Sequence, residues 1–435
     1  MSDLLLMGGG RGSYGESFVY AGNLEFEVSS SQSSPTLPLN LSSEGTYDFT
    51  IDWGDGSSDV ITAYDQPETS HQYSSTGTYP ISISGQIDNT PFFTANTAFN
   101  LNSVSAWGNF QLDTSGTFAN LTIANNPVLA PYTGNVQNYR RAFERTNPKI
   151  YNAAGGNSII DLNGWDTSNA TSLEGIFASA KFGNVLISNW DVSSVTDMSY
   201  AFFDARSDSA INISNWDVSN VTNFQDTFSF TYSSLSVSDI TGWDTSSATN
   251  MTNMFKLAHN FNQNISTWNV SNVQSFENMF SQNFGFNQPI GSWDMSSATT
   301  IAGMFFLGSV FNQPIGNWNT SNVQSFAGVF GNLFTNVKTP FNQDISNWDF
   351  TGCLDSDSML YIFGLGIAGY TAFCNMSQAN YEALLISWAS QAANMPTGMR
   401  NIDSDFVYGA GSAAEAARTT LVSTYGWTIT DGGAV

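Results

Sequence analysis

The sequence predicts a mainly β protein with short helices, in which a small β-sandwich precedes a long parallel solenoid that an α/β C-terminal cap closes. Three observations support this order. Alternating apolar and polar residues with Gly/Asp turns fill residues 23–90, tryptophans recur about every 25 residues within 91–375, and two amphipathic helical patterns follow in 376–435. Residues 1–22 are rich in glycine, and we expect a flexible or docking segment there.

Residues 46–56, TYDFTIDWGDG, alternate in polarity up to an acidic turn, and H-Q-Y and G-T-Y-P-I-S-I follow at 71–73 and 77–83. Such alternation with turn residues predicts a small β-sandwich. The W-G-D-G, H-x-Y and G-T-Y motifs resemble the PKD domain over roughly residues 23–88. That resemblance implies an immunoglobulin-like sandwich with a spacer or adhesive role. Asp52 and Asp55 either cap the turn or contact a cation.

A repeat dominates the middle of the chain. The spacing between successive tryptophans is 25 to 27 residues, and 30 at the last interval. An Ile or Leu stands three residues before each tryptophan, and a Phe stands twelve after it, except for Leu360 in the last repeat. The tryptophans are Trp165, Trp190, Trp216, Trp243, Trp268, Trp293, Trp318 and Trp348.

One such repeat cannot bury its own aromatic face, whereas stacked repeats can. The I-x-x-W-D-V-S stretch favours a strand. The stretch 195–202, VTDMSYAF, has apolar spacings typical of a short helix or 3₁₀ turn. A strand and a short helix per repeat predict a leucine-rich-repeat-like solenoid with its tryptophans in register. Residues 91–160 carry weaker motifs, as terminal coils do.

The residue after each tryptophan is Asp or, at 269 and 319, Asn. In a stack these side chains form a ladder, which is either a row of cation or ligand contacts or a set of acceptors for turn amides. The two Asn substitutions favour the second interpretation. We expect the serines three residues after the tryptophans to cap the short helix, and the amides of the recurring FNQ motif to form ladders or close turns.

Near the C-terminus, Ser377 opens a helical pattern with Tyr381, Leu384, Leu385 and Trp388 on one face. The capping box at 412–415 opens a second helix, which Gly426 ends, and residues 427–430 follow as a short strand. We interpret 376–435 as a C-terminal cap.

The repeats and this tail (NYEALLISW, AAR, GWTITDGG) resemble BspA-like leucine-rich-repeat surface proteins over about residues 95–433. The resemblance implies a leucine-rich-repeat fold and cell-surface adhesion, and it supplies no catalytic residues. Such modules also resemble those on bacteriophage virions.

The composition of the chain argues against nucleic acids and anionic membranes as binding partners, and against a disulfide scaffold or a Cys/His metal site. The chain has 435 residues, 11 Lys+Arg, 36 Asp+Glu and a formal net charge of −25. Nucleic-acid binders need clustered bases, and anionic membrane surfaces repel such a chain. The two cysteines, Cys353 and Cys374, and the two histidines, His71 and His259, are too few for a disulfide scaffold or a Cys/His metal site. We expect no cofactor and no bound metal.

No apolar run is long enough to cross a membrane. The N-terminal apolar run, residues 4–7, is shorter than the ~7–15 residues of a signal peptide. We therefore expect a chain that is not exported by that route, or a mature one.

The sequence offers little catalytic chemistry. The glycine motifs at 10–15 and 364–369 lack the strand–helix context of a dinucleotide site. Paired carboxylates are the one chemistry that composition leaves open, yet the acids belong to the repeat pattern. Cys353 takes an apolar position of its repeat and is expected as a buried thiol, the alternative being a pair with Cys374.

We therefore expect a non-enzymatic virion surface protein (tail, fibre or capsid decoration) that is made in the host cytoplasm and contacts the host. Its expected partners are other virion proteins and a host-surface glycan or protein. The alternatives are an exported bacterial surface adhesin and a solenoid glycan hydrolase or lyase. Insertions after Trp216, Trp318 and Trp348 bring aromatic residues out of the repeat pattern. The predicted contact residues are Phe230, Tyr232, Phe334 and Tyr370.

Overall fold

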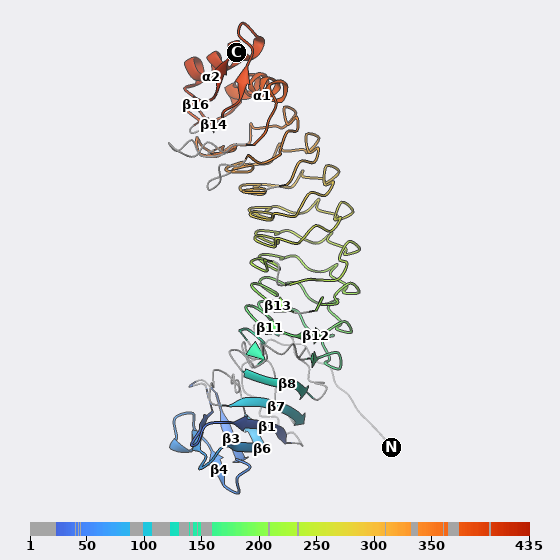
Figure 1. The fold of residues 1–435 in the computed structure, drawn as a ribbon, viewed down its shortest axis with the longest axis vertical. Helices are drawn as coiled ribbons and strands as arrows, with labels where there is room; N and C mark the ends of the chain where they lie inside the picture. The colour runs from blue at the N-terminus through green and yellow to red at the C-terminus, as the bar shows by residue number, and fades with distance from the viewer. Residues whose placement is uncertain are drawn as a thin grey trace, which may run out of the picture.

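The structure is a computed structural model, and the chain is mainly β with few short helices (Figure 1). The described residues are 23–87, 99–106, 122–129, 139, 142–145, 147–148, 159–363 and 374–435, apart from positions 40, 42, 44, 208, 233–234, 309, 332–337, 360 and 400–401. No closed barrel occurs in these ranges. Figure 1 shows an elongated molecule in which stacked coils separate an N-terminal sheet from two C-terminal helices.

The N-terminal sheet contains the strands that the alternating pattern predicts. Strands β1 (Leu24–Ser30), β3 (Tyr47–Asp52), β4 (Ser58–Ile61) and β6 (Gly77–Ile87) pair antiparallel in the order β4-β3-β6-β1. A separate pair joins β2 (Thr36–Pro38) to β5 (Ser70–Gln72), which follows the 3₁₀ turn η1 (Pro67–Thr69). The buried residues alternate along β1 and β3, so one face of the sheet covers a core.

The same sheet continues beyond residue 90. Strand β7 (Asn100–Ala106) pairs antiparallel with β1, and β8 (Thr122–Leu129) and β9 (Asn147–Pro148) then add in parallel. The sheet therefore changes from antiparallel hairpins to parallel stacking without a break (Figure 1).

The repeats stack in parallel. Strand β10 (Ile159–Asp161) pairs with β12 (Asn184–Leu186), and β11 (Lys181–Phe182) pairs with β13 (Arg206–Ser207). Further along, the residue seven positions after each tryptophan forms a parallel bridge to its counterpart in the next repeat, from Ser172 through to Ser325. We call each such repeat a coil.

The tryptophans lie in register, which confirms the predicted column. Each indole Nε1 from Trp190 to Trp348 donates to the carbonyl oxygen of the Ile or Leu that precedes the previous tryptophan by three residues, at 2.8–3.2 Å. Trp190 and Trp216 stack with ring centroids 6.1 Å apart. A second column of stacked phenylalanines runs beside it, for example Phe255 and Phe280 at 5.8 Å.

The second half of each coil is a run of turns, so the expected short helix is wrong; of the 3₁₀ alternative the described coils contain only single i→i+3 bonds, such as Ala201 N to Met198 O at 3.1 Å. The strand expected over I-x-x-W-D-V-S is also wrong, because these residues turn, with Trp190 N bonded to Ile187 O at 3.2 Å. Residues ten and fourteen positions after the tryptophan take positive φ, as at Tyr200 (57°) and Asp204 (48°), and such residues interrupt a right-handed helix. Alternate amides instead donate to the next coil: Tyr200 N bonds Gln225 O at 2.8 Å and Phe202 N bonds Thr227 O at 2.9 Å. The serines expected to cap a helix therefore serve turns.

The C-terminal residues form the helices that the sequence predicts. Helix α1 (Gln378–Gln391) begins at the Ser377 cap, and α2 (Ala413–Tyr425) runs from the Ser412 cap to a left-handed Gly426. The short 3₁₀ turn η2 (Ala392–Asn394) follows α1. Strands β14 (Ile402–Asp403) and β15 (Val407–Tyr408) pair in parallel with β16 (Ile429–Thr430) and β17 (Gly433–Ala434).

Helix α1 packs against the last coil. The Gln391 side chain donates to Trp348 O and accepts from Phe350 N, and the Trp388 ring contacts Phe350 and Phe363. Neither described helix is long and apolar enough to cross a membrane.

Candidate functional site

The acids that follow the tryptophans accept backbone hydrogen bonds, which confirms the turn interpretation of this ladder. The Oδ1 atom of Asp191 accepts from Ser193 N at 3.0 Å, and Asn269 accepts from Ser271 N at 3.1 Å in the same way. All eight repeats make this bond. The amide ladder of the FNQ motif is also present: Gln288 Nε2 donates to the Asn262 side chain, and Gln313 Nε2 donates to Asn287.

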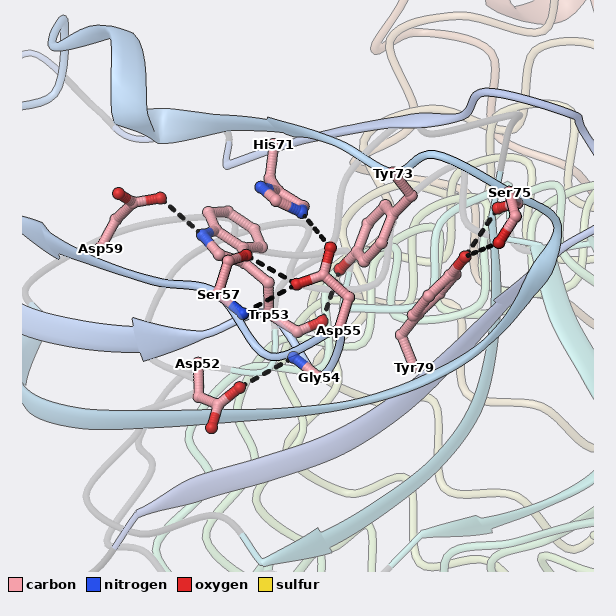
Figure 2. Close-up of polar contacts among 10 residues, drawn as sticks. All are labelled: Asp52, Trp53, Gly54, Asp55, Ser57, Asp59, His71, Tyr73, Ser75 and Tyr79. Atoms are coloured by element: carbon pink, nitrogen blue, oxygen red, sulfur yellow. Dashed lines mark hydrogen bonds and ion pairs between the residues drawn. The ribbon is translucent and has the colours of Figure 1, made fainter.

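The acidic turn of the N-terminal sheet is a dense polar cluster (Figure 2). Asp52 Oδ1 accepts from Gly54 N at 2.9 Å, and Asp55 Oδ1 accepts from Ser57 N at 3.0 Å, so both carboxylates cap the turn as expected. Gly54 has φ +75°, and a Cβ there would lie 2.3 Å from Pro80 O. Only glycine fits this turn, because both its conformation and the close backbone exclude a side chain.

His71 fixes the same turn from β5. Its Nε2 lies 2.8 Å from Asp55 Oδ2, and its ring stacks on Trp53 at 4.8 Å. Burial acts to raise the pKa of Asp55, but hydrogen bonds from Ser57 and His71 outweigh it and leave the pKa below its ordinary value.

The order of these groups does not suit nucleophilic catalysis. The Asp55 carboxylate stands between the Ser57 hydroxyl, at 2.6 Å, and the His71 imidazole, as Figure 2 shows. A serine nucleophile needs the imidazole between hydroxyl and carboxylate. Across the described ranges, no three His, Cys, Asp or Glu side chains are grouped so that they could hold a metal ion. The cluster therefore holds the turn together.

Both cysteines are buried free thiols. Burial raises the pKa of Cys353 and of Cys374 to about 12, so neither is a thiolate at neutral pH. The default expectation for Cys353 is confirmed.

A row of aromatic side chains runs along one side of the stack, exposed at Tyr232 and Phe284 and half-buried at Phe230 and His259, and we call these four residues the aromatic edge. Tyr232 meets His259 edge-on at 5.2 Å, and His259 stacks on Phe284 at 4.4 Å. Tyr232 is 39% exposed and Phe284 44%. Burial lowers the pKa of His259, so the row is uncharged at neutral pH. The edge thus presents aromatic rings that the core does not need.

Two of the four predicted contact residues lie on this edge. Phe334 and Tyr370 lie outside the described residues. The insertion after Trp216 predicts Phe230 and Tyr232 outside the repeat pattern, and this is wrong for both. Phe230 stands fourteen residues after Trp216 with φ 59°, like Leu257 (58°) in the next coil, and Tyr232 stands sixteen after it, at a position that the next two coils share.

His259 and Phe284 were missed, although the sequence carries a signal for them. Tyr232, His259 and Phe284 all stand sixteen residues after a tryptophan. Alignment of the repeats on their tryptophans therefore places these three side chains in one column, whereas a search for insertions finds only Tyr232.

A hollow of about 130 Å³ lies beside the aromatic edge. Tyr232 and Leu235 line it from one coil, and Phe261 and Gln263 from the next. Lys256 lies over the Phe230 ring at 5.9 Å. Aromatic faces beside amide groups can bind a sugar ring or an aromatic side chain.

Comparison with known proteins links the repeats to one family. Comparisons with curated proteins and with solved structures give no significant match. Residues 148–234, 229–348 and 311–364 each match the model of the family described as "Mycoplasma protein of unknown function, DUF285". BspA-like repeat proteins are in this group. Residues 148–364 of the sequence are therefore similar to DUF285, the group that contains the BspA-like repeat proteins.

Proposed function

We propose that the chain is a non-enzymatic adhesion protein whose aromatic edge holds a glycan or protein of a host surface. The observation that carries the proposal is the row of partly exposed rings at Tyr232, His259 and Phe284, which the folded core does not require. Exposed aromatic groups gathered in one place mark binding surfaces. The similarity to a group with BspA-like members supports the same role.

The architecture in this proposal has three parts. The coils form a leucine-rich-repeat-like parallel solenoid, an immunoglobulin-like PKD domain precedes it, and the C-terminal helices cap it. The backbone bonds between successive coils support the first part, and the packing of α1 on Trp348 and Phe350 supports the last. A stack of this kind offers a long surface on which each coil adds a contact.

The proposed location is a bacteriophage virion surface, with a bacterial cell surface as the alternative. Mass spectrometry of purified particles and of isolated cell surfaces distinguishes them, because the chain is expected in only one of the two preparations.

Binding to intact bacteria tests the adhesion proposal. The double variant Tyr232→Ala/Phe284→Ala should bind a panel of bacterial strains at least about tenfold more weakly than the wild type, because two stacking contacts are lost. The control Tyr64→Ala/Leu354→Ala removes side chains that are 45% and 70% exposed elsewhere, and it should bind normally. Equal binding by both variants would reject the aromatic edge. Sugar release from the same cells would favour a glycan hydrolase or lyase instead.

A further inference from the structure

We infer that a second surface of the stack, distinct from the aromatic edge, binds a neutral, extended polysaccharide along the stack axis. The site is an open hollow of about 740 Å³, here called the polar groove. It crosses the four coils that begin at Trp243, Trp268, Trp293 and Trp318. Its lining side chains are all Ser, Thr, Asn or Gln.

Four of the lining side chains are free to bind a ligand. Ser247, Gln274, Ser297 and Gln324 line the groove and make no side-chain hydrogen bond within the described part of the chain. Both glutamines are exposed. Each free amide offers donors and an acceptor, and each hydroxyl offers both, which is the combination that sugar hydroxyls require.

Four of the other five lining side chains are held in place by hydrogen bonds to neighbouring coils. Thr249 and Thr299 donate their hydroxyl protons to the carbonyl oxygens of Thr222 and Gln274, at 3.1 and 3.0 Å. Asn272 Nδ2 likewise donates to Ser246 O at 2.8 Å, and Asn322 Nδ2 donates to Ser296 O. The directions of their unused acceptor lone pairs are therefore fixed before a ligand binds. Less conformational entropy of these side chains is then lost on binding.

The absence of charge in the lining selects the ligand class. The chain carries a formal net charge of −25, yet no Asp, Glu, Lys or Arg lines the groove. Nucleic acids and acidic glycans need bases to neutralise them, and the groove provides none. A neutral polymer rich in hydroxyl groups fits this lining.

The spacing of the coils favours a sugar chain over a peptide. Successive coils lie about 4.8 Å apart, as neighbouring strands do, whereas an extended peptide presents same-side groups about every 6.7 Å. The side chains of an extended peptide therefore do not match the spacing of the coils that line the groove. An extended β-1,4-linked chain of six-membered sugar rings advances per ring by slightly more than one strand spacing, so its rings stay nearly in step across the four coils.

The chemistry of the groove also alternates. The coils of Trp243 and Trp293 present Ser and Thr, and those of Trp268 and Trp318 present Asn and Gln. In an extended β-linked chain, successive rings are turned over, so that like edges recur every second ring. The two-coil period of the groove therefore matches the two-ring period of such a chain.

Calorimetric titration of the full chain with three neutral hexasaccharides tests the inference. Cellohexaose and β-1,4-mannohexaose are extended, whereas the α-linked maltohexaose coils. At least one extended probe should bind, and maltohexaose should bind at least about tenfold more weakly. Binding of neither extended probe, or equal binding of maltohexaose, would overturn the inference.

Two matched variants locate the binding. Gln274→Ala/Gln324→Ala should weaken binding of the extended probe by about tenfold or more, because two free amides are lost. Gln32→Ala/Gln72→Ala removes two exposed glutamines far along the chain from the groove, one after β1 and one in β5, and should leave binding unchanged. Thermal melting should be alike for both variants, since neither removes a side-chain hydrogen bond that the structure shows. If the first variant and the wild type bind the extended probe with equal affinity, the polar groove is not the binding site. The adhesion proposal is tested separately, by the binding of the Tyr232→Ala/Phe284→Ala variant to bacteria.

Discussion

The Trp268→Ala variant should destabilise the middle of the stack by about 4–6 kcal/mol. Trp268 is 3% exposed, and it stacks on Trp243 with ring centroids 6.3 Å apart. Truncation of a buried aromatic residue costs roughly 3–5 kcal/mol. Its indole also donates to Ile240 O at 3.1 Å, and the net loss of such a bond adds about 1 kcal/mol. The penalty for an unsatisfied carbonyl does not arise, because Ile240 O keeps its bond from Trp243 N.

Urea denaturation gives the change in the free energy of unfolding, and hydrogen exchange followed by mass spectrometry gives its location. Because each coil contacts only its neighbours, exchange should rise first in the coils beside Trp268 and not in β1 or β6. Leu354→Ala, at a side chain 70% exposed, should stay within about 0.5 kcal/mol of the wild type. A loss below about 1 kcal/mol for Trp268→Ala, or exchange that rises evenly along the chain, would refute the role of the tryptophan column.

Three further predictions concern single side chains. Because the pKa of Asp55 is lowered in the folded chain, its carboxylate stabilises the fold above the ordinary Asp pKa, and this stabilisation is lost as the pH falls through the lowered value. Asp55→Asn should therefore reduce the loss of unfolding free energy between neutral and acidic pH, measured by urea denaturation at several pH values. The same loss in the variant and the wild type would contradict this prediction. Cys353 and Cys374 should resist Ellman's reagent at pH 8 until the chain is unfolded, and rapid labelling of the folded chain would show that these thiols are accessible. Asp191→Asn should change the free energy of unfolding in urea by less than about 0.5 kcal/mol, because Asn269 accepts the same turn bond in its own coil. Asp191→Ala removes the acceptor and should cost about 1 kcal/mol. Equal costs for the two variants would contradict the role of this bond.

The features that could be predicted from sequence depend on local side-chain chemistry. Asp191 accepts its turn amide, Ser377 caps α1, and Trp190 follows the spacing of the column, because each has one favourable partner at a fixed distance along the chain or in the next coil.

The turns in the second half of each coil could not be predicted in the same way. A run of turns places apolar side chains at the same spacings as a short helix, so the pattern fits both. Tyr200 and Leu257 take positive φ although their side chains do not favour it. Hydrogen bonds from these residues to the next coil impose that conformation. The sequence of a single repeat does not show which bonds its backbone makes to the next coil. For the aromatic edge, the unequal spacing after Trp216 indicates Tyr232 alone, whereas His259 and Phe284 follow only when the repeats are aligned on their tryptophans.

The alternation in the polar groove has a consequence for how this chain could lengthen or shorten during evolution. The tryptophan column repeats with every coil, so the core would accept the gain or loss of a single coil. The groove repeats only with every second coil, and a single-coil insertion would place Asn and Gln beside Asn and Gln. Duplication in pairs preserves both periods. If the groove is under selection, copies of this stretch should therefore differ in length by even numbers of coils.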